Sequence, residues 1–309
     1  MSLGLAGLHL LLPALRSVAA TPEARLLFLG TQDLTFTYEQ AVNFLGTQGI
    51  EIQEVPPSER RTTNSFAFVS HEDWWQYKDF LHQETLLRMF GFEPKQSSIL
   101  DMDDYEHASI IHDLNRPIPD YIGTFDLILN QGTLEHIFDV RQALWNLSQL
   151  TREGGQIVHM VPAGFLNHGF YNFNACLFSD FYGQSGWKQE DLFYTLAPRL
   201  AGSDEIYGKI VPEALHTIPE GFDLEIFARY RKSANTTAPI VTQGLYVGLH
   251  EAWNHQTREQ SLQNAPEESK SSRRGLFQIT RDRLQKRQAL KRLQRLGATI
   301  VVPVRRTDA

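Results

Sequence analysis

Two groups of polar residues in this sequence have side-chain types and spacing suited to proton transfer. Glu135 and His136 are adjacent in a turn after an apolar run, and His168 precedes Tyr171 and Asn172 in a polar, aromatic loop. Histidine accepts a proton most readily near neutral pH, and a carboxylate can orient its ring. We predict that His168 is a general base assisted by Tyr171. His136 is the second candidate base, and Glu135 either orients it or contacts a ligand.

These residues follow strands of a predicted βαβ unit. The apolar run 125–129 ends at Asn130, apolar residues recur at helical spacing over 140–150, and a second apolar run covers 156–161. We expect Gly154 and Gly155 to end the intervening helix. Ligands of parallel sheets bind beyond the carboxyl ends of the strands. Asn130 and both groups of polar residues are therefore expected at one edge of a sheet.

Further strands are predicted on both sides of this unit. The runs 25–30, 98–102 and 109–112 are short and apolar, and the last two lead into acidic residues, Asp101 and Asp113. Two late runs, 221–231 and 239–250, also read as strands. The segment 187–200 reads as a helix. Such an alternation of strands and helices indicates an α/β fold with a mostly parallel sheet.

The sequence from FDLILNQGTLEHI through LTREGG to the next strand resembles the fourth and fifth strands of class I S-adenosylmethionine-dependent methyltransferases. The resemblance continues through YEHASIIHDLNRPIP upstream and NHGFYNFN downstream, over about residues 25–250. It implies a Rossmann-like, doubly wound, seven-stranded and mostly parallel sheet with a final antiparallel strand. It also implies S-adenosylmethionine as cofactor and a small-molecule acceptor, such as a natural product or sugar, with a hydroxyl oxygen expected to receive the methyl group.

The resemblance also implies a set of cofactor contacts. In this family an acidic residue after the second strand holds the ribose hydroxyls, a role for which Asp101 is favoured over Asp103, and Asp113 matches the position at the adenine edge. The glycine-rich turn expected after the first strand is reduced to GTQDLTF, where side chains replace the later glycines. The predicted cofactor-binding residues are Gly30, Gln32, Asp33, Asp101, Asp113, Leu114 and Asn130.

The altered glycine loop leaves a second function open. A chain that has lost the cofactor could persist as a binding or assembly module on the same fold. The loop also lacks the G-x-G-x-x-G fingerprint, which disfavours a nicotinamide-dependent oxidoreductase. Methyl transfer needs no metal, and none is predicted, although His107, His112 and the acids of DMDD could assemble one.

Composition and charge are those of a soluble globular protein. The 309 residues are 42% hydrophobic and 21% charged, and the one cysteine excludes an internal disulfide framework. The net charge of −7 argues against general nucleic-acid binding. Residues 270–306 nevertheless hold twelve Lys or Arg and one Asp, about +11, which leaves about −18 for the rest.

Three regions follow from these patterns: residues 1–24 as an N-terminal helix, 25–254 as the methyltransferase-like domain and 255–309 as a polar linker with a basic arm. The first region is interpreted as a helix broken or kinked at Pro13, with a signal peptide as the alternative. Residues 37–95 are interpreted as an aromatic-rich helical insertion that forms part of the core, a lid over the site, or a wall against the substrate. The basic arm either lies across the acidic body or mediates homo-oligomerisation or docking. No membrane span is expected, and a cytoplasmic location is predicted.

Overall fold

The structure is a computed structural model of the chain. It describes residues 3–21, 23–62, 79–104, 107–165, 168–198, 207–209, 222–238, 243 and 299–301. The strand predicted at 239–250, apart from residue 243, lies outside the described residues, as do the linker and helix of the C-terminal arm and the tryptophans of the insertion. In the described part of the chain, no helix is both long and apolar enough to cross a membrane.

A seven-stranded sheet forms the centre of the molecule, with strands in the order β3-β2-β1-β4-β5-β8-β6. Strand β8 is antiparallel to both of its neighbours, and the pairs from β3 to β5 are parallel. The strands are β1 (Leu26–Leu29), β2 (Ser97–Asp101), β3 (Ile110–Ile111), β4 (Phe125–Gln131), β5 (Thr151–Pro162), β6 (Lys188–Pro198) and β8 (Phe222–Arg231). The order β3-β2-β1-β4-β5 is that of Rossmann folds, so the predicted fold class is confirmed.

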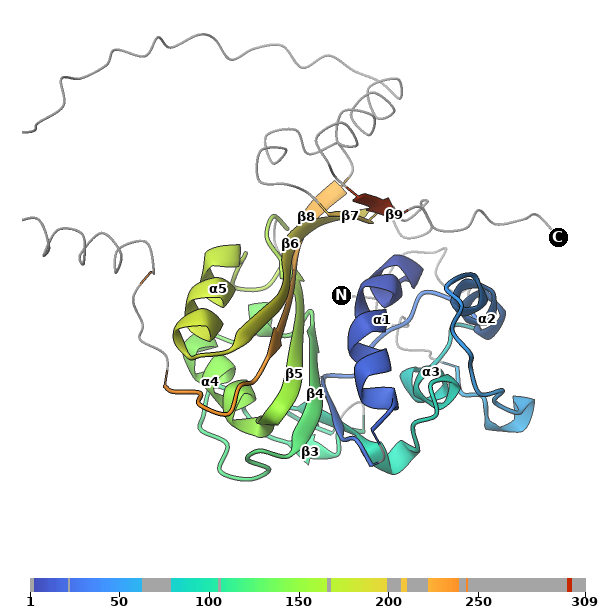
Figure 1. The fold of residues 1–309 in the computed structure, drawn as a ribbon, viewed down its shortest axis with the longest axis horizontal. Coiled ribbons are helices and arrows are strands. Elements are labelled where there is room, and N and C mark those ends of the chain that lie inside the picture. Colours follow the sequence, from blue (N-terminus) through green and yellow to red (C-terminus); the bar gives the residue numbers. More distant parts are fainter. Residues whose placement is uncertain are drawn as a thin grey trace, which may run out of the picture.

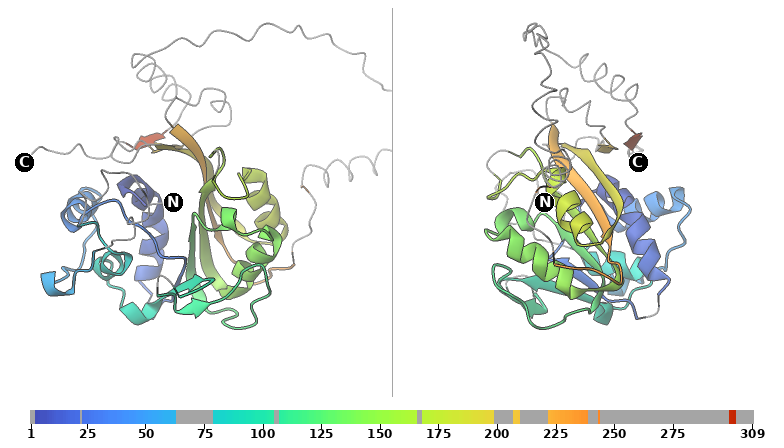
Figure 2. Two further views of the ribbon diagram at one scale, coloured as in Figure 1. Left: turned by 180° about the vertical axis from the view of Figure 1, so that it is seen from behind. Right: turned by 60° about the vertical axis from the view of Figure 1, so that its left-hand side comes forward.

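Helices cover both faces of this sheet (Figure 1). Helices α1 (Leu5–Ala19), α2 (Tyr38–Thr47) and α3 (Gln83–Met89) lie on one face, and α4 (Val140–Leu150) and α5 (Ala175–Gln184) lie on the other. The two further views show the same three layers (Figure 2). Short 3₁₀ turns η1 (Pro57–Glu59), η4 (Pro94–Gln96) and η5 (Leu134–His136) connect these elements, and β7 (Tyr207–Lys209) pairs with β9 (Thr299–Val301) in a small separate sheet.

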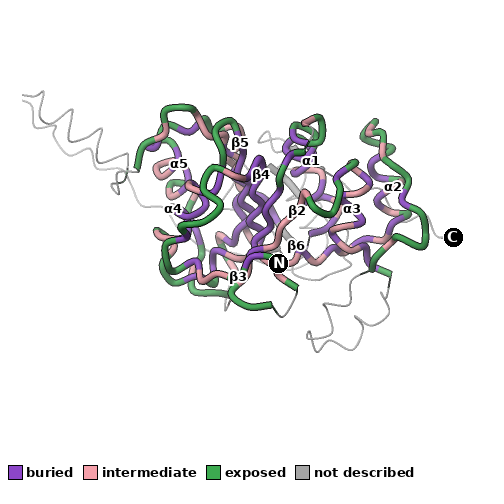
Figure 3. The backbone as a smooth tube through the Cα atoms, turned by 90° about the horizontal axis from the view of Figure 1, so that it is seen from below, coloured by how far each residue is buried: buried purple, intermediate pink, exposed green. Residues whose placement is uncertain are grey.

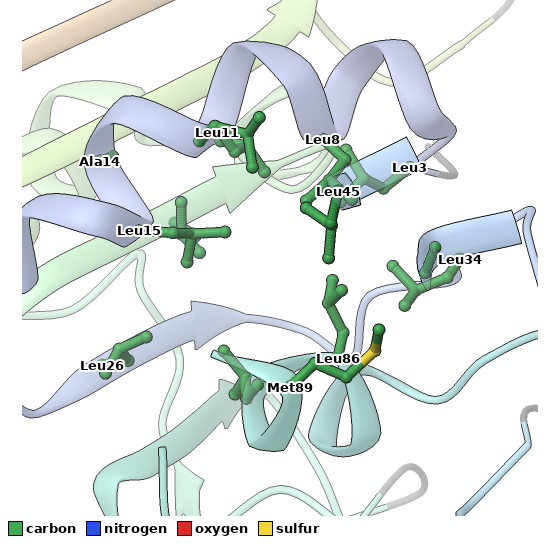
Figure 4. Packing of buried hydrophobic residues seen from close by; sticks show 14 of the residues in the cluster. Leu3, Leu8, Leu11, Ala14, Leu15, Leu26, Leu34, Leu45, Leu86 and Met89 are labelled. Carbon is green, nitrogen blue, oxygen red and sulfur yellow. The ribbon is translucent and has the colours of Figure 1, made fainter. Parts of the chain in front are cut away.

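The alternation of side chains along each central strand produces two hydrophobic cores. On β1, Leu26 and Phe28 pack with α1, α2 and α3, whereas Leu27 and Leu29 belong to the cluster that includes α4 and α5. The central strands are buried along their length (Figure 3). The close-up in Figure 4 shows leucines of α1, such as Leu11, above β1 and α3. The predicted N-terminal helix is present as α1, most of its leucines are buried in the core on this face of the sheet, and it continues through Pro13 without a break.

Two predictions of secondary structure are wrong. The segment predicted as a helix at 187–200 contains strand β6, because its Leu-Phe-Tyr-Thr run pairs with β8 along ten register positions. Helix α4 ends at Leu150, before the two glycines. There the Thr151 hydroxyl donates to the Leu147 carbonyl, and Gly154 and Gly155 lie inside β5 instead.

Candidate active site

The first predicted cofactor contacts lie together where β1 and β2 end. Gly30 has φ +71°, a left-handed conformation that favours glycine. A Cβ placed on Gly30 would lie 3.5 Å from Oδ2 of Asp101, whose Oδ1 accepts a hydrogen bond from the Met102 amide at 2.6 Å. The structure therefore brings bare backbone and a carboxylate side by side.

The next strand end carries Asp113, which is partly exposed and held in a turn. Its Oδ1 accepts hydrogen bonds from the amide and the side chain of Asn115, and these bonds lower the pKa of the Asp113 carboxyl. The Arg116 guanidinium lies 3.6 Å from its other oxygen. Leu114 is buried in the core on the α4 side. Asp113 therefore has one oxygen committed to its own turn.

The loop after β1 uses side chains to tie its backbone down. The amide of Gln32 donates to Oε1 of Gln83 at 2.7 Å, and its side-chain amide donates back to the carbonyls of Leu29 and Gly30. The backbone carbonyl of Asp33 accepts from Leu3 at 2.7 Å. Gln32 thus points back onto the strand end, and its amide is committed to a protein partner.

Asn130, at the end of β4, belongs to a buried hydrogen-bond chain. Its Oδ1 accepts from the Leu134 amide at 3.2 Å, and its Nδ2 lies 3.0 Å from Nδ1 of His159. The other ring nitrogen of His159 lies 2.8 Å from the Tyr182 hydroxyl. Since the Asn130 amide donates to Nδ1, the proton of the neutral imidazole is placed on Nε2. This chain fixes the η5 turn, which carries Glu135 and His136.

Three of the four predicted catalytic residues form one cluster. Glu135 is fully buried, His168 is half-buried and His136 is exposed, and one ligand-type atom from each lies within 4.8 Å of the others. We call these three residues the Glu–His–His cluster. Nε2 of His168 lies 3.4 Å from Oε1 of Glu135, and the two imidazole centroids are 5.0 Å apart. The structure thus brings together residues from two loops, 32 positions apart.

The electrostatics of the cluster favour uncharged side chains. Burial raises the pKa of the Glu135 carboxyl to about 7. Burial also lowers the pKa of the His136 and His168 imidazoles. Within the described part of the chain, the two carboxyl oxygens of Glu135 have no hydrogen-bond partner. Nε2 of His168 has none either. The Glu135 oxygens and His168 Nε2 are therefore buried atoms with unused bonding capacity, and His136 beside them is exposed.

The loop after β5 is held closely against Glu135. A Cβ on Gly169, whose φ is +69°, would lie 2.7 to 2.9 Å from atoms of Glu135, and the Phe170 amide donates to the Glu135 carbonyl at 2.7 Å. The Tyr171 hydroxyl instead donates to the Phe138 carbonyl at 2.8 Å. Asn172 accepts from the amide of Phe165 and donates to its carbonyl. Tyr171 and Asn172 thus shape the loop that carries His168.

No protein-family model and no curated protein sequence matches this chain. Its fold is similar to that of the YcgJ protein from Bacillus subtilis, at 12% identity and TM-score 0.36, over 73% of this chain and 98% of that one. A Burkholderia thailandensis 1,6-didemethyltoxoflavin N1-methyltransferase with bound S-adenosylhomocysteine is 13% identical over 72% and 78% of the chains, with TM-score 0.32. An S-adenosylmethionine-dependent methyltransferase from Thermotoga maritima is 15% identical over 72% and 87%, with TM-score 0.31.

With similarities this low, the fold assignment rests on the sheet itself. Six strands run in one direction, and β8, inserted between β5 and β6, runs against them. The chain has the class I methyltransferase fold. The sequence resemblance implied a mostly parallel sheet with a final antiparallel strand, but the predicted late pair was 221–231 with 239–250, whereas β8 pairs with β6 (Lys188–Pro198).

Several residues near this candidate site were not predicted. Asp223 and Glu225, on β8, face His168 and Glu135 closely enough to interact with them electrostatically, and burial raises the pKa of the Glu225 carboxyl to about 7. His159 is the central member of the hydrogen-bond chain that joins Asn130 to Tyr182 beneath the η5 turn. The only sequence signals were a lone histidine and a lone glutamate within otherwise apolar strands, QIVHMVP and LEIF.

A groove of about 630 Å³ lies beside the cluster's loops, between α4 and α5. Phe138, Tyr171, Cys176 and Phe181 are among its lining residues. A smaller, mainly apolar pocket of about 20 Å³ lies between α1 and the strand ends beside Gln32. Gly30, Asp101 and Asp113 line neither of these two spaces.

Proposed function

We propose that this protein is an S-adenosylmethionine-dependent methyltransferase that acts on a hydroxyl group of a small molecule. The observation that carries the proposal is the pairing of Gly30 with Asp101 at the ends of β1 and β2. A carboxylate accepts two hydrogen bonds from neighbouring hydroxyls, and Gly30 places backbone without a side chain beside that carboxylate. These two residues fit the ribose of the cofactor.

When bound, S-adenosylmethionine supplies a methyl group carried on a positively charged sulfur. The protein's own contribution is to position the cofactor and acceptor and to keep water away. Asp101 would hold the ribose, and Asp113 would reach the adenine edge with the oxygen that Asn115 does not occupy. The Gln32 loop and Asp33 would close the cofactor side.

The Glu–His–His cluster supports an acceptor with a hydroxyl. A hydroxyl must lose its proton when its oxygen receives the methyl group, and an imidazole with a lowered pKa is neutral and able to accept that proton. We assign this step to the cluster, with His168 as the predicted base, because its Nε2 has no hydrogen-bond partner in the described residues. Glu135 lies 3.4 Å from that nitrogen and would stabilise the imidazolium.

Calorimetric titration of the purified protein with S-adenosylmethionine and S-adenosylhomocysteine tests the proposal. We expect micromolar binding, roughly −8 kcal/mol, that Asp101→Ala abolishes. Asp104→Ala is the matched control, because it removes a nearby acid that follows the strand. His168→Gln should leave cofactor affinity near the wild-type value and lower turnover once an acceptor is known. The absence of binding at millimolar ligand would contradict the proposal.

The loop after β1 favours a second function. The Gln32 amide is already bonded to Gln83, so this backbone donor is not available to a cofactor. A chain that binds no cofactor would use the same fold as a binding or assembly module. The same titration separates the two, because the module would give no heat with either compound, in the wild-type protein or in Gln83→Ala.

A further inference from the structure

The Glu–His–His cluster has the composition of a metal site. Two imidazoles and one carboxylate are ligands that zinc and other divalent transition metals accept, and a set of three leaves a coordination position open for water or substrate. The three donor atoms lie within 4.8 Å of one another. Among the described residues, these are the histidine and acidic side chains that lie close enough together to share one ion. His107 and His112 belong to no such group.

The bonding state of these atoms points to a missing partner. Both oxygens of Glu135 and Nε2 of His168 are buried and make no hydrogen bond within the described part of the chain. A fully buried carboxylate without partners carries a large desolvation cost, which a cation bound to it would offset. The one close approach, 3.4 Å between Oε1 and Nε2, equals the spacing of about 3.4 Å between two ligands of a tetrahedral zinc ion.

The surroundings suit a cation as well. Asp223 interacts electrostatically with His168, and Glu225 with Glu135, so two further acids surround the ligands. Residues of this kind orient ligands and add negative charge in metal sites. On the other side, the exposed ring of His136 gives an ion and a fourth ligand access from solvent.

The loops hold the ligands in place before any ion binds. The Phe170 amide donates to the Glu135 carbonyl, and any side chain larger than that of Gly169 would clash with Glu135 at this position. From below, the Asn130 side chain holds the η5 turn through the Leu134 amide. The three ligand atoms already lie within 4.8 Å of one another, and His136 is the exposed member of the set.

From this geometry we propose that Glu135, His136 and His168 bind one divalent transition-metal ion, zinc or a metal of similar ligand preference. A hydroxyl that occupied the open position would lose its proton to solvent more readily, because coordination lowers its pKa. In the metal-loaded protein His168 would then act as a ligand instead of a base. Metal binding does not depend on the proposed methyl transfer, so the two proposals can fail separately.

The test uses the full chain, stripped with a chelator and titrated with zinc chloride by calorimetry. Cobalt chloride serves as a spectroscopic probe, because cobalt in a low-coordinate site absorbs visible light strongly. We expect one ion per chain and at least a tenfold loss of affinity in Glu135→Gln and in His168→Gln. His107→Gln and Cys176→Ser are controls that remove other metal-binding side chains, and both should keep the wild-type affinity.

Thermal unfolding of each apo variant checks that the fold survives. Glu135→Gln keeps the shape of the side chain and removes a buried charge, and His136→Ala alters an exposed ring, so at least one ligand variant is expected to remain folded. The proposal is overturned if no ion binds at micromolar concentration. It is also overturned if folded ligand variants bind as the wild type does, or if His107→Gln or Cys176→Ser abolishes binding.

Discussion

The buried imidazole of His159 should make the stability of this protein depend on pH in a defined way. His159 is fully buried, and its ring lies between the Asn130 amide and the Tyr182 hydroxyl. Burial lowers its pKa from 6.5 to about 3. Protonation would also set a donor on Nδ1 against the donating amide of Asn130. The folded protein therefore keeps this ring neutral where the unfolded chain protonates it.

The sign follows from proton binding. Between pH 6.5 and pH 3 the unfolded state binds this proton and the folded state does not, so the free energy of unfolding falls as the pH falls. At pH 5.0, 1.5 units below the ordinary pKa, His159 should lower that free energy by about 2 kcal/mol relative to pH 7.5, at about 1.4 kcal/mol per unit.

Urea unfolding of wild type and His159→Gln at pH 7.5 and pH 5.0 measures this contribution. Replacement should destabilise the protein at pH 7.5 by about 1 to 3 kcal/mol, through lost hydrogen bonding. The deficit should shrink by about 2 kcal/mol at pH 5.0, because other titrating groups cancel in the difference. His107→Gln, which removes an exposed ring, should keep the wild-type pH dependence. An equal deficit for His159→Gln at both pH values would refute the reasoning.

Three further predictions concern stability and the site. Gly169→Ala should destabilise the protein by about 1 to 3 kcal/mol in urea unfolding, because the new methyl group meets Glu135 at a positive φ; Gly154→Ala, with an open surrounding, should cost less. Asn146→Ala should cost about 2 to 3 kcal/mol, since its buried amide bonds to the Leu114 and Arg116 carbonyls and the Ile118 amide, and a variant near wild-type stability would contradict this. Thr37→Ala should cost about 1 kcal/mol by removing the N-cap of α2, measurable by thermal unfolding against the exposed Thr47→Ala.

Strands with local signals were predictable from the sequence. The apolar runs of β1 and β4 need no knowledge of their neighbours, because a strand buried on both faces is apolar throughout. The N-cap of α5 at Asn174 was also predictable, since the cap bonds to the Cys176 amide two residues away. Strand β6 was not, because its partner β8 begins at Phe222, 24 residues after β6 ends at Pro198, and aromatic residues such as Phe193 and Tyr194 also occur in helices.

The site was predictable only as a location. Strand order placed Glu135, His136 and His168 at one edge of the sheet, and Gly30 beside Asp101. Pairing required the folded chain: Asn130 was predicted as a cofactor contact, yet its side chain bonds to His159, 29 residues further on. The burial of Glu135 could not be predicted either. Nothing around it in the sequence indicates that its carboxyl group is buried without a hydrogen-bond partner.

The position of β8 between β5 and β6 determines when the sheet can be completed during synthesis. Strand β6 leaves the ribosome before β8, yet in the seven-stranded sheet it pairs with β8 alone. Strand β5 likewise keeps one side uncovered until β8 arrives. A nascent chain that ends before residue 222 therefore exposes an unpaired β5 edge and an unattached β6, both able to pair with other chains. Strand β8 completes the sheet by inserting between β5 and β6, and not by adding at an edge. Translation must therefore pass residue 231 before these strand edges are protected from aggregation.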